Sequence, residues 1–225
     1  MFVLYTNFLH NVFSSQQCNY LNLDMGATMP HFFETQDLFA LRQQQAMYDE
    51  SYWLLMVYAE RMRHIAIHLD RCVRRIERAA EDLSQVALDQ LRSAVMPDVL
   101  MHALQLSCAT GVDPGVAYQR ASQSRINEYF DLEGHASRIS DESEASQQDW
   151  WQQLARDVHR YGGVVMDAAH DFEHGDPLDS TEVRQSVIGN LLVLAEIMAE
   201  ALDADPVAAW QQRLESNKQR FEPVR

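Results

Sequence analysis

Cysteine, glycine and proline are all scarce in this chain of 225 residues. Three cysteines are too few for a disulfide framework, which favours a reducing, cytoplasmic location. The 8 glycines and 6 prolines exclude a collagen-like or low-complexity chain. No apolar run reaches the roughly 18 residues that a transmembrane helix needs, so no membrane partner is expected.

Positive charge is also in short supply. Asp and Glu number 33 against 18 Lys and Arg, which gives a formal net charge of −15. Such a surface repels the backbone of DNA or RNA, so no nucleic-acid polymer is expected as a partner. Lys218 is the only lysine, and every other basic side chain apart from histidine is an arginine.

The residues that are present favour helices along the whole chain. Ala, Leu, Gln and Arg are frequent, and apolar residues recur at helical spacing between residues 59 and 82. The apolar face of that helix comprises Ile65, Leu69, Cys72, Ile76 and Ala79. Further helices are expected from near Glu34 and at about 89–110, 114–130, 150–174 (loosened at Gly162-Gly163), 180–202 and 206–221. The predicted fold class is all-α.

Composition divides the chain into four segments. Residues 1–30 are unlike the rest and are either an N-terminal arm or the product of a mis-called start. Residues 131–149 are acidic and rich in serine, which is typical of a linker. The linker separates a first half at 31–130 from a second half at 150–225.

The two halves resemble each other at a fixed offset of 92 residues. In each half an Asp-Pro pair opens a helix, at Asp113-Pro114 and at Asp205-Pro206. Other ungapped identities include Leu100/Leu192, Ala103/Ala195, Ala117/Ala209, Gln119/Gln211 and Ser124/Ser216. Any two helix–turn–helix units share some of these features, but the common register favours a duplication. Two such units are expected to pack as one helical bundle, burying Leu100, Leu104, Leu191, Leu194 and Met198 between them.

Three stretches of the repeat carry a family resemblance. They are Asp98-Val-Leu-Met-His-Ala-Leu-Gln-Leu, Thr110-Gly-Val-Asp113, and the helix from Asp205 through Asn217-Lys218 to Arg220. On these motifs each half resembles the MazG-like all-α nucleoside triphosphate pyrophosphohydrolases, over about 60–130 and 150–221. The resemblance implies that the chain is a degenerate tandem repeat of that fold. It also implies a nucleotide as the ligand.

The same resemblance implies Mg²⁺ as a cofactor, bound by Glu-x-x-Glu on one helix and Glu-x-x-Asp on the next. The second pair falls on Val95-Met-Pro-Asp98 in the first half and on Val187-Ile-Gly-Asn190 in the second, so only Asp98 matches. Asp167 and Asp171 form another carboxylate pair, at i,i+4. The candidate metal ligands are therefore Asp98, Asp167 and Asp171. For the last two, the alternative is an exposed acidic face.

Candidate phosphate ligands lie beside the apolar face of the 59–82 helix. One stripe there carries Glu60, His64, His68, Arg71, Arg75, Arg78 and Asp82. Arginine forks match phosphate oxygens. The alternatives are a solvated face of paired charges and a transition-metal site at His64 and His68, which are spaced i,i+4. The family resemblance adds Asn217, Lys218 and Arg220 near the end of the last helix, where phosphate or nucleotide contacts are implied. The candidates for binding phosphate or nucleotide are His64, His68, Arg71, Arg75, Asn217 and Lys218.

Two functions follow as hypotheses. The first is a MazG-like nucleotide-binding protein, extending to pyrophosphate release from a nucleoside triphosphate with degenerate metal ligands. The second is a catalytically inactive helical protein with an interaction or regulatory role. Neither hypothesis assigns a catalytic residue, and a homodimer is a candidate assembly.

Overall fold

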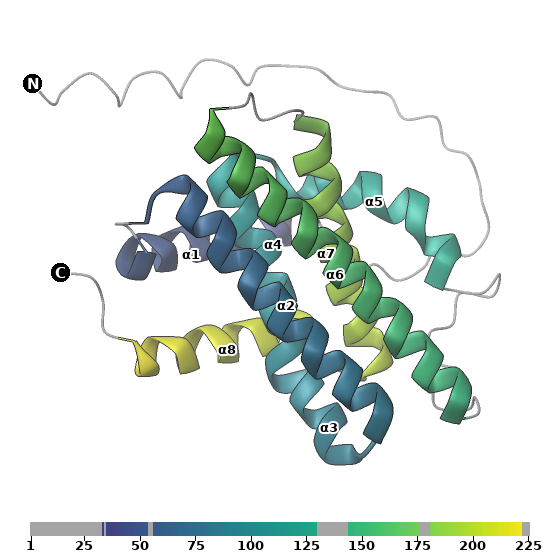
Figure 1. Ribbon diagram of the computed structural model, residues 1–225. Helices are drawn as coiled ribbons and strands as arrows, with labels where there is room; N and C mark the ends of the chain where they lie inside the picture. The colour runs from purple at the N-terminus through teal and green to yellow at the C-terminus, as the bar shows by residue number, and fades with distance from the viewer. Residues whose placement is uncertain (1–32, 34, 54–55, 130–143, 176–180, 222–225) are drawn as a thin grey trace, which may run out of the picture. The chain divides into compact units, whose positions relative to one another are not determined.

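Helix follows helix along the chain, with no strand among the residues that the structure describes. The computed structural model describes residue 33 and residues 35–53, 56–129, 144–175 and 181–221. The helices are α1 (Thr35–Trp53), α2 (Tyr58–Asp82), α3 (Gln85–Gln90), the π-helical segment η1 (Leu91–Val95), α4 (Met96–Thr110), α5 (Pro114–Tyr129), α6 (Glu144–His174), α7 (Thr181–Ala201) and α8 (Pro206–Arg220). Figure 1 shows them as one helical bundle, which confirms the predicted all-α fold class.

Helices α4 and α7 pack against each other at the centre of the bundle. Every residue from Met96 to Ser107 of α4 is buried, and so is every residue from 187 to 199 of α7. Helices that are buried on all sides lie in the interior of a domain. The five side chains expected between the halves are all buried, namely Leu100, Leu104, Leu191, Leu194 and Met198.

Helices α2 and α6 run side by side along one flank of this centre (Figure 1). The predicted apolar face of α2, from Ile65 to Ala79, is buried. Helix α6 passes through Gly162-Gly163 without the expected interruption. Gly162 faces α2, where an added Cβ would lie at an ordinary contact distance of 3.5 Å from the Cβ of Leu69.

Helix α6 also begins earlier than its sequence pattern indicates. Its first residue is Glu144 rather than Trp150, so the end of the predicted linker is helical. The expectations for residues 1–30 and 131–143 lie outside the described residues. The predicted helix at 89–110 corresponds to the end of α3, η1 and α4, with a π-helical stretch that hydrophobic periodicity does not indicate.

The two Asp-Pro turns have closely similar geometry. The Asp113 carboxylate accepts hydrogen bonds from the backbone N–H groups of Gly115 and Val116, and the Asp205 carboxylate does the same for Val207 and Ala208. Before each turn one residue has a positive φ, +73° at Gly111 and +47° at Asp203. Each turn therefore ends one helix with a left-handed residue and begins the next with an aspartate cap.

Contacts between the halves are reciprocal. Helix α5 packs on α7, and α8 packs on α4, so each half's last helix covers the other half's central helix. The pairs α2–α6 and α4–α7 each join corresponding helices of the two halves. Two copies of one unit related by an approximate two-fold axis would make this set of contacts, which supports the duplication hypothesis.

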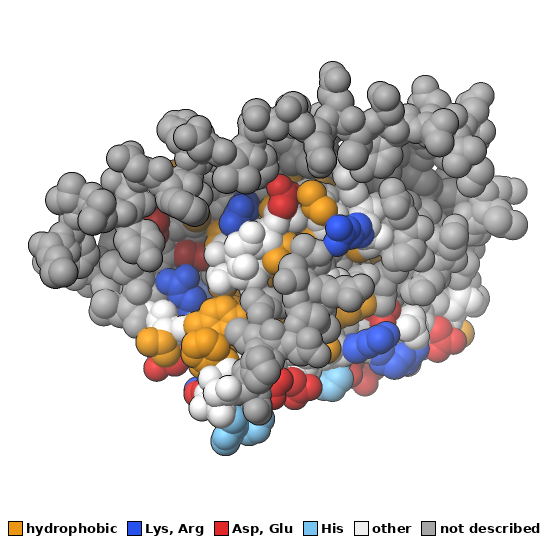
Figure 2. Space-filling view, turned by 90° about the horizontal axis from the view of Figure 1, so that it is seen from above, with side chains coloured by type: hydrophobic (Ala, Val, Ile, Leu, Met, Phe, Trp, Pro, Cys, Tyr) orange, Lys and Arg blue, Asp and Glu red, His pale blue; other side chains and the backbone are white. Residues whose placement is uncertain are grey.

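Basic and acidic side chains are interspersed on the face that Figure 2 shows, among the side chains coloured there. In the described part of the chain, no helix combines the length and the apolar character needed to cross a bilayer.

The close approach of α7 to α5 at Gly189 allows a prediction about stability. A Cβ on Gly189 of α7 would lie 2.1 Å from the backbone oxygen of Ala117 on α5, so Gly189→Ala forces the helices apart. We expect it to lower the free energy of unfolding by about 3 kcal/mol in urea denaturation. Gly163→Ala is the matched control, because its Cβ would meet no atom within 4 Å and alanine favours the helix. Equal stability of the two variants would contradict this packing.

Candidate functional site

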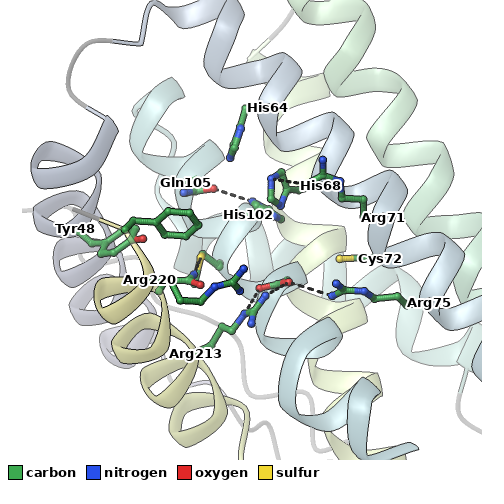
Figure 3. Close-up of a pocket in the computed structure, with 14 residues that line it drawn as sticks. Tyr48, His64, His68, Arg71, Cys72, Arg75, His102, Gln105, Arg213 and Arg220 are labelled. Carbon is green, nitrogen blue, oxygen red and sulfur yellow. Dashed lines mark hydrogen bonds and ion pairs between the residues drawn. The ribbon is translucent and has the colours of Figure 1, made fainter. Parts of the chain in front are cut away.

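A pocket of about 310 Å³ opens where α1, α2, α4 and α8 converge (Figure 3). Four arginines and one carboxylate give its lining a charge of +3 when the histidines are neutral. The lining residues are Tyr48, His64, His68, Arg71, Cys72, Arg75, Asp98, Met101, His102, Gln105, Arg213, Asn217, Arg220 and Phe221. The pocket is thus electropositive in a chain of net charge −15.

Helical spacing explains which side chains reach the pocket. From α2 come His64, His68, Arg71 and Arg75, at spacings of 4, 3 and 4 residues, which lie on one face of a helix. The neighbouring face of α2 is buried, so this stripe lies at the edge of the core. The structure therefore brings together the four α2 residues that the sequence nominates.

Helix α8 supplies the opposite wall through Arg213, Asn217 and Arg220, at spacings of 4 and 3 residues. Asn217 was predicted, and its amide nitrogen lies 3.8 Å from the Met101 sulfur. Lys218, also predicted, does not line this pocket. It follows Asn217 by about 100° around the helix, and its ammonium pairs with Glu215 at 2.5 Å.

Asp98 forms the strongest ion pair of the pocket. The Arg213 guanidinium donates to both carboxylate oxygens, with Nε–Oδ1 at 2.7 Å and Nη2–Oδ2 at 2.9 Å. Arg75 lies 3.9 Å from the same carboxylate. Asp98 is 6% exposed, so this bidentate pair is largely removed from water. The hydrogen bonds to Asp98 raise the pKa of Arg213 further above its ordinary value.

The pocket does not suit Mg²⁺, which needs several oxygen ligands. Asp98 is its only carboxylate, and both of its oxygens are bonded to Arg213. Asp167 and Asp171 lie on α6, where Asp167 is exposed and neither lines the pocket. Within the described ranges, no group of three or more His, Cys, Asp or Glu side chains is placed to hold a metal ion.

Three histidines lie in series along one side of the pocket. The ring centroids of His64 and His68 are 4.3 Å apart, and those of His68 and His102 are 5.3 Å apart. Burial, together with His68 and Arg71, lowers the pKa of His64 to about 4. Burial, His102 and Arg71 lower that of His68 to about 4. The histidines are thus neutral at pH 7 and offer both hydrogen-bond donors and acceptors.

Two buried polar atoms of the lining have no hydrogen-bond partner in the described part of the chain. They are the Tyr48 hydroxyl oxygen and His102 Nε2. Burial raises the pKa of Tyr48 to about 12, so its hydroxyl keeps its proton. Burial also raises the pKa of the Cys72 thiol, so this cysteine is not a thiolate nucleophile. Buried polar groups without partners are uncommon, so these two atoms are open to a hydrogen bond from a ligand or a water molecule.

The sequence did not nominate Arg213, His102, Gln105 or Tyr48 as ligands, whereas Arg220, which was placed with Asn217 and Lys218, lines the pocket. A signal existed for Arg213, because it shares a helix face with Asn217 and Arg220. For His102 and Gln105 no signal existed, since they lie in an apolar helix and gain their importance from the elements packed around it.

Comparison with models of protein families, with curated proteins and with solved structures finds no match to this chain.

The depressed histidine pKa values predict a pH dependence of stability. In the unfolded chain His64 and His68 titrate near pH 6.5, and in the folded chain near pH 4. Between these values the unfolded state binds more protons, so the free energy of unfolding falls as the pH decreases. Replacing both histidines by glutamine should make this acid-induced fall in the free energy of unfolding smaller. Urea denaturation of the variant and the wild-type protein, each at about pH 7 and about pH 4.5, measures the difference.

The matched control is the double variant His170→Gln/His174→Gln, since both residues are exposed on α6. We expect it to keep the wild-type loss of stability in acid. The explanation is wrong if the variant lacking His64 and His68 keeps that loss as well.

Proposed function

We propose that this chain binds a nucleotide, or a closely related phosphate-bearing small molecule, in the pocket between α2, α4 and α8. The observation that carries the proposal is the convergence of four arginines from two helices around one carboxylate. In a chain of net charge −15, this concentration of positive charge favours an anionic ligand by its sign alone.

Guanidinium groups suit phosphate because their donors form a planar fork that pairs with two oxygens. Arg71 and Arg75 have exposed side chains on α2, and Arg220 reaches the same pocket from α8. An anion between the helices can therefore be contacted from both walls. Phe221, which lines the rim, offers an apolar ring surface for the rest of the ligand.

The proposal favours binding without Mg²⁺-dependent hydrolysis. The triphosphate pyrophosphohydrolases that the halves resemble depend on clustered carboxylates, whereas this pocket has a single aspartate held by Arg213. A binding or regulatory role without turnover is consistent with that ligand set.

The proposed duplication also supports a single site per chain. At the offset of 92 residues, His102 corresponds to Leu194, Gln105 to Ile197 and Arg213 to Ala121. These three counterparts are buried apolar residues. The positions that match these three polar residues of the pocket are therefore occupied by apolar core residues, so the duplication provides no second pocket of the same kind.

Arginine variants test the proposal. We expect Arg71→Ala and Arg75→Ala each to weaken binding of ATP about tenfold, because each removes a charged hydrogen-bond donor. Isothermal titration calorimetry at about 50 mM and about 300 mM salt measures the affinities, and higher salt should weaken them.

Arg74→Ala is the matched control. Arg74 is an exposed neighbour on the same helix, pairs with Asp70 and does not line the pocket. Binding that responds equally to Arg74→Ala and Arg75→Ala would mean that the pocket is not the ligand site. ATP hydrolysis abolished by Asp98→Asn but retained in the arginine variants would favour the metal-dependent enzyme instead.

A further inference from the structure

A chain of hydrogen bonds leads from α8 through α1 to His102 on α4. The Trp210 indole N–H donates to Gln45 Oε1 at 3.2 Å, and Gln45 Nε2 donates to Asp49 Oδ1 at 2.8 Å. Gln105 Nε2 donates to the same Asp49 oxygen at 3.2 Å. The other end of the Gln105 amide, Oε1, lies 2.8 Å from His102 Nδ1.

The chemistry of these groups fixes the direction of every bond. An indole nitrogen can only donate, so the Gln45 amide turns its oxygen to Trp210 and its nitrogen to Asp49. Asp49 Oδ1 is then an acceptor, which in turn directs the Gln105 nitrogen to it. The Gln105 oxygen is left facing His102, and because an amide oxygen only accepts, His102 Nδ1 must donate.

The lone pair of His102 therefore resides on Nε2. His102 is 3% exposed, and burial lowers its pKa, so the ring is neutral with its one proton on Nδ1. Nε2 is the atom without a partner noted above. The pocket thus combines arginine donors with a buried, unsatisfied nitrogen that can only accept.

We propose that His102 Nε2 accepts a hydrogen bond from the ligand, so that the pocket selects oxyanions carrying a proton donor over fully ionised ones. The matching ligand class comprises hydrogen phosphate and phosphate monoesters with a hydroxyl group near the phosphate. This inference rests on the proposed function. A fully ionised oxyanion presents only acceptors and leaves Nε2 unsatisfied, which costs about 1–3 kcal/mol in general.

The neighbouring His68 provides the path to this atom. Its Nε2 accepts a hydrogen bond from Arg71 Nη1 at 3.3 Å, and its partly exposed ring packs edge-on against His102. Figure 3 shows His68 between His102 and Arg71. An anion that takes up the Arg71 donors releases His68, and rotation of that ring opens His102 to the ligand.

Four probes at about pH 8 test the inference by calorimetry at constant ionic strength. Sulfate is the anion of a strong acid and carries no proton at this pH. Methyl phosphate carries none either, because the second pKa of a phosphate monoester is about 6. Inorganic phosphate keeps one proton, and ribose 5-phosphate has hydroxyl groups. We expect phosphate to bind about tenfold tighter than sulfate, or ribose 5-phosphate about tenfold tighter than methyl phosphate.

The two comparisons distinguish the source of the donor. A preference for phosphate over sulfate and over methyl phosphate assigns the donor to the phosphate group itself. A preference for ribose 5-phosphate over methyl phosphate assigns it to a hydroxyl. Either preference should disappear in His102→Leu, while sulfate affinity stays within about twofold of the wild-type value.

Two further measurements guard against a folding defect in that variant. Gln105→Met removes the acceptor that fixes the tautomer, so it should reduce the donor preference without removing any arginine. In the wild-type protein, ¹⁵N NMR should find His102 Nε2 unprotonated, with a resonance that moves on addition of the preferred probe but not of sulfate.

If all four probes bind through Arg71 and Arg75 but those with a proton donor bind no tighter, the role of His102 is wrong and the proposed anion site still stands. The role of His102 is also wrong if the preference survives His102→Leu, as it would if water satisfied Nε2 throughout. If no probe binds, or if the arginine variants bind all of them normally, the proposed function fails as well.

Discussion

The ion pair between Asp98 and Arg213 is the interaction on which the pocket depends. It joins α4 to α8 across 115 positions of sequence, with two hydrogen bonds on a carboxylate that is almost entirely buried. Removing one partner of a buried ion pair typically costs about 3–5 kcal/mol, because the other charge is left uncompensated. The pair thus holds α8 as the second wall of the pocket.

The same pair determines what the pocket can bind. Asp98 neutralises the charge of Arg213. The other three arginines of the lining, Arg71, Arg75 and Arg220, leave the pocket with a net positive charge, because the lining has no second carboxylate. Their donors suit oxyanions, and the single engaged aspartate does not suit a hard divalent cation. Electrostatics at this point of the fold therefore favours a phosphate-bearing ligand held without a metal ion.

Much of this arrangement could be predicted from local sequence. The buried face of α2, the caps at Asp113 and Asp205, and the polar stripe from His64 to Arg75 all follow from helical periodicity, which depends only on residues close in the chain. The identity of the opposite wall could not be predicted in the same way. Which residue of α8 meets Asp98 depends on how the halves pack, and that is a tertiary property.

Two positions show what a local pattern leaves open. Lys218 was nominated beside Asn217, but adjacent positions on a helix point about 100° apart, so only one of them faces the pocket. The glycine pair in α6 was expected to loosen the helix, yet the helix is continuous there and Gly162 faces Leu69 of α2. His102 could not be recognised at all, because the hydrogen bonds that orient its ring come from α1 and α8 through Gln105.

The central claim is that arginines, rather than a metal ion, bind the ligand. Titration of ATP into the wild-type protein, once in EDTA and once in excess Mg²⁺, with pyrophosphate release assayed on the same samples, tests it most directly. We expect binding in EDTA at least as tight as in Mg²⁺, and no release of pyrophosphate. Binding that appears only with Mg²⁺ and is accompanied by pyrophosphate release would contradict it.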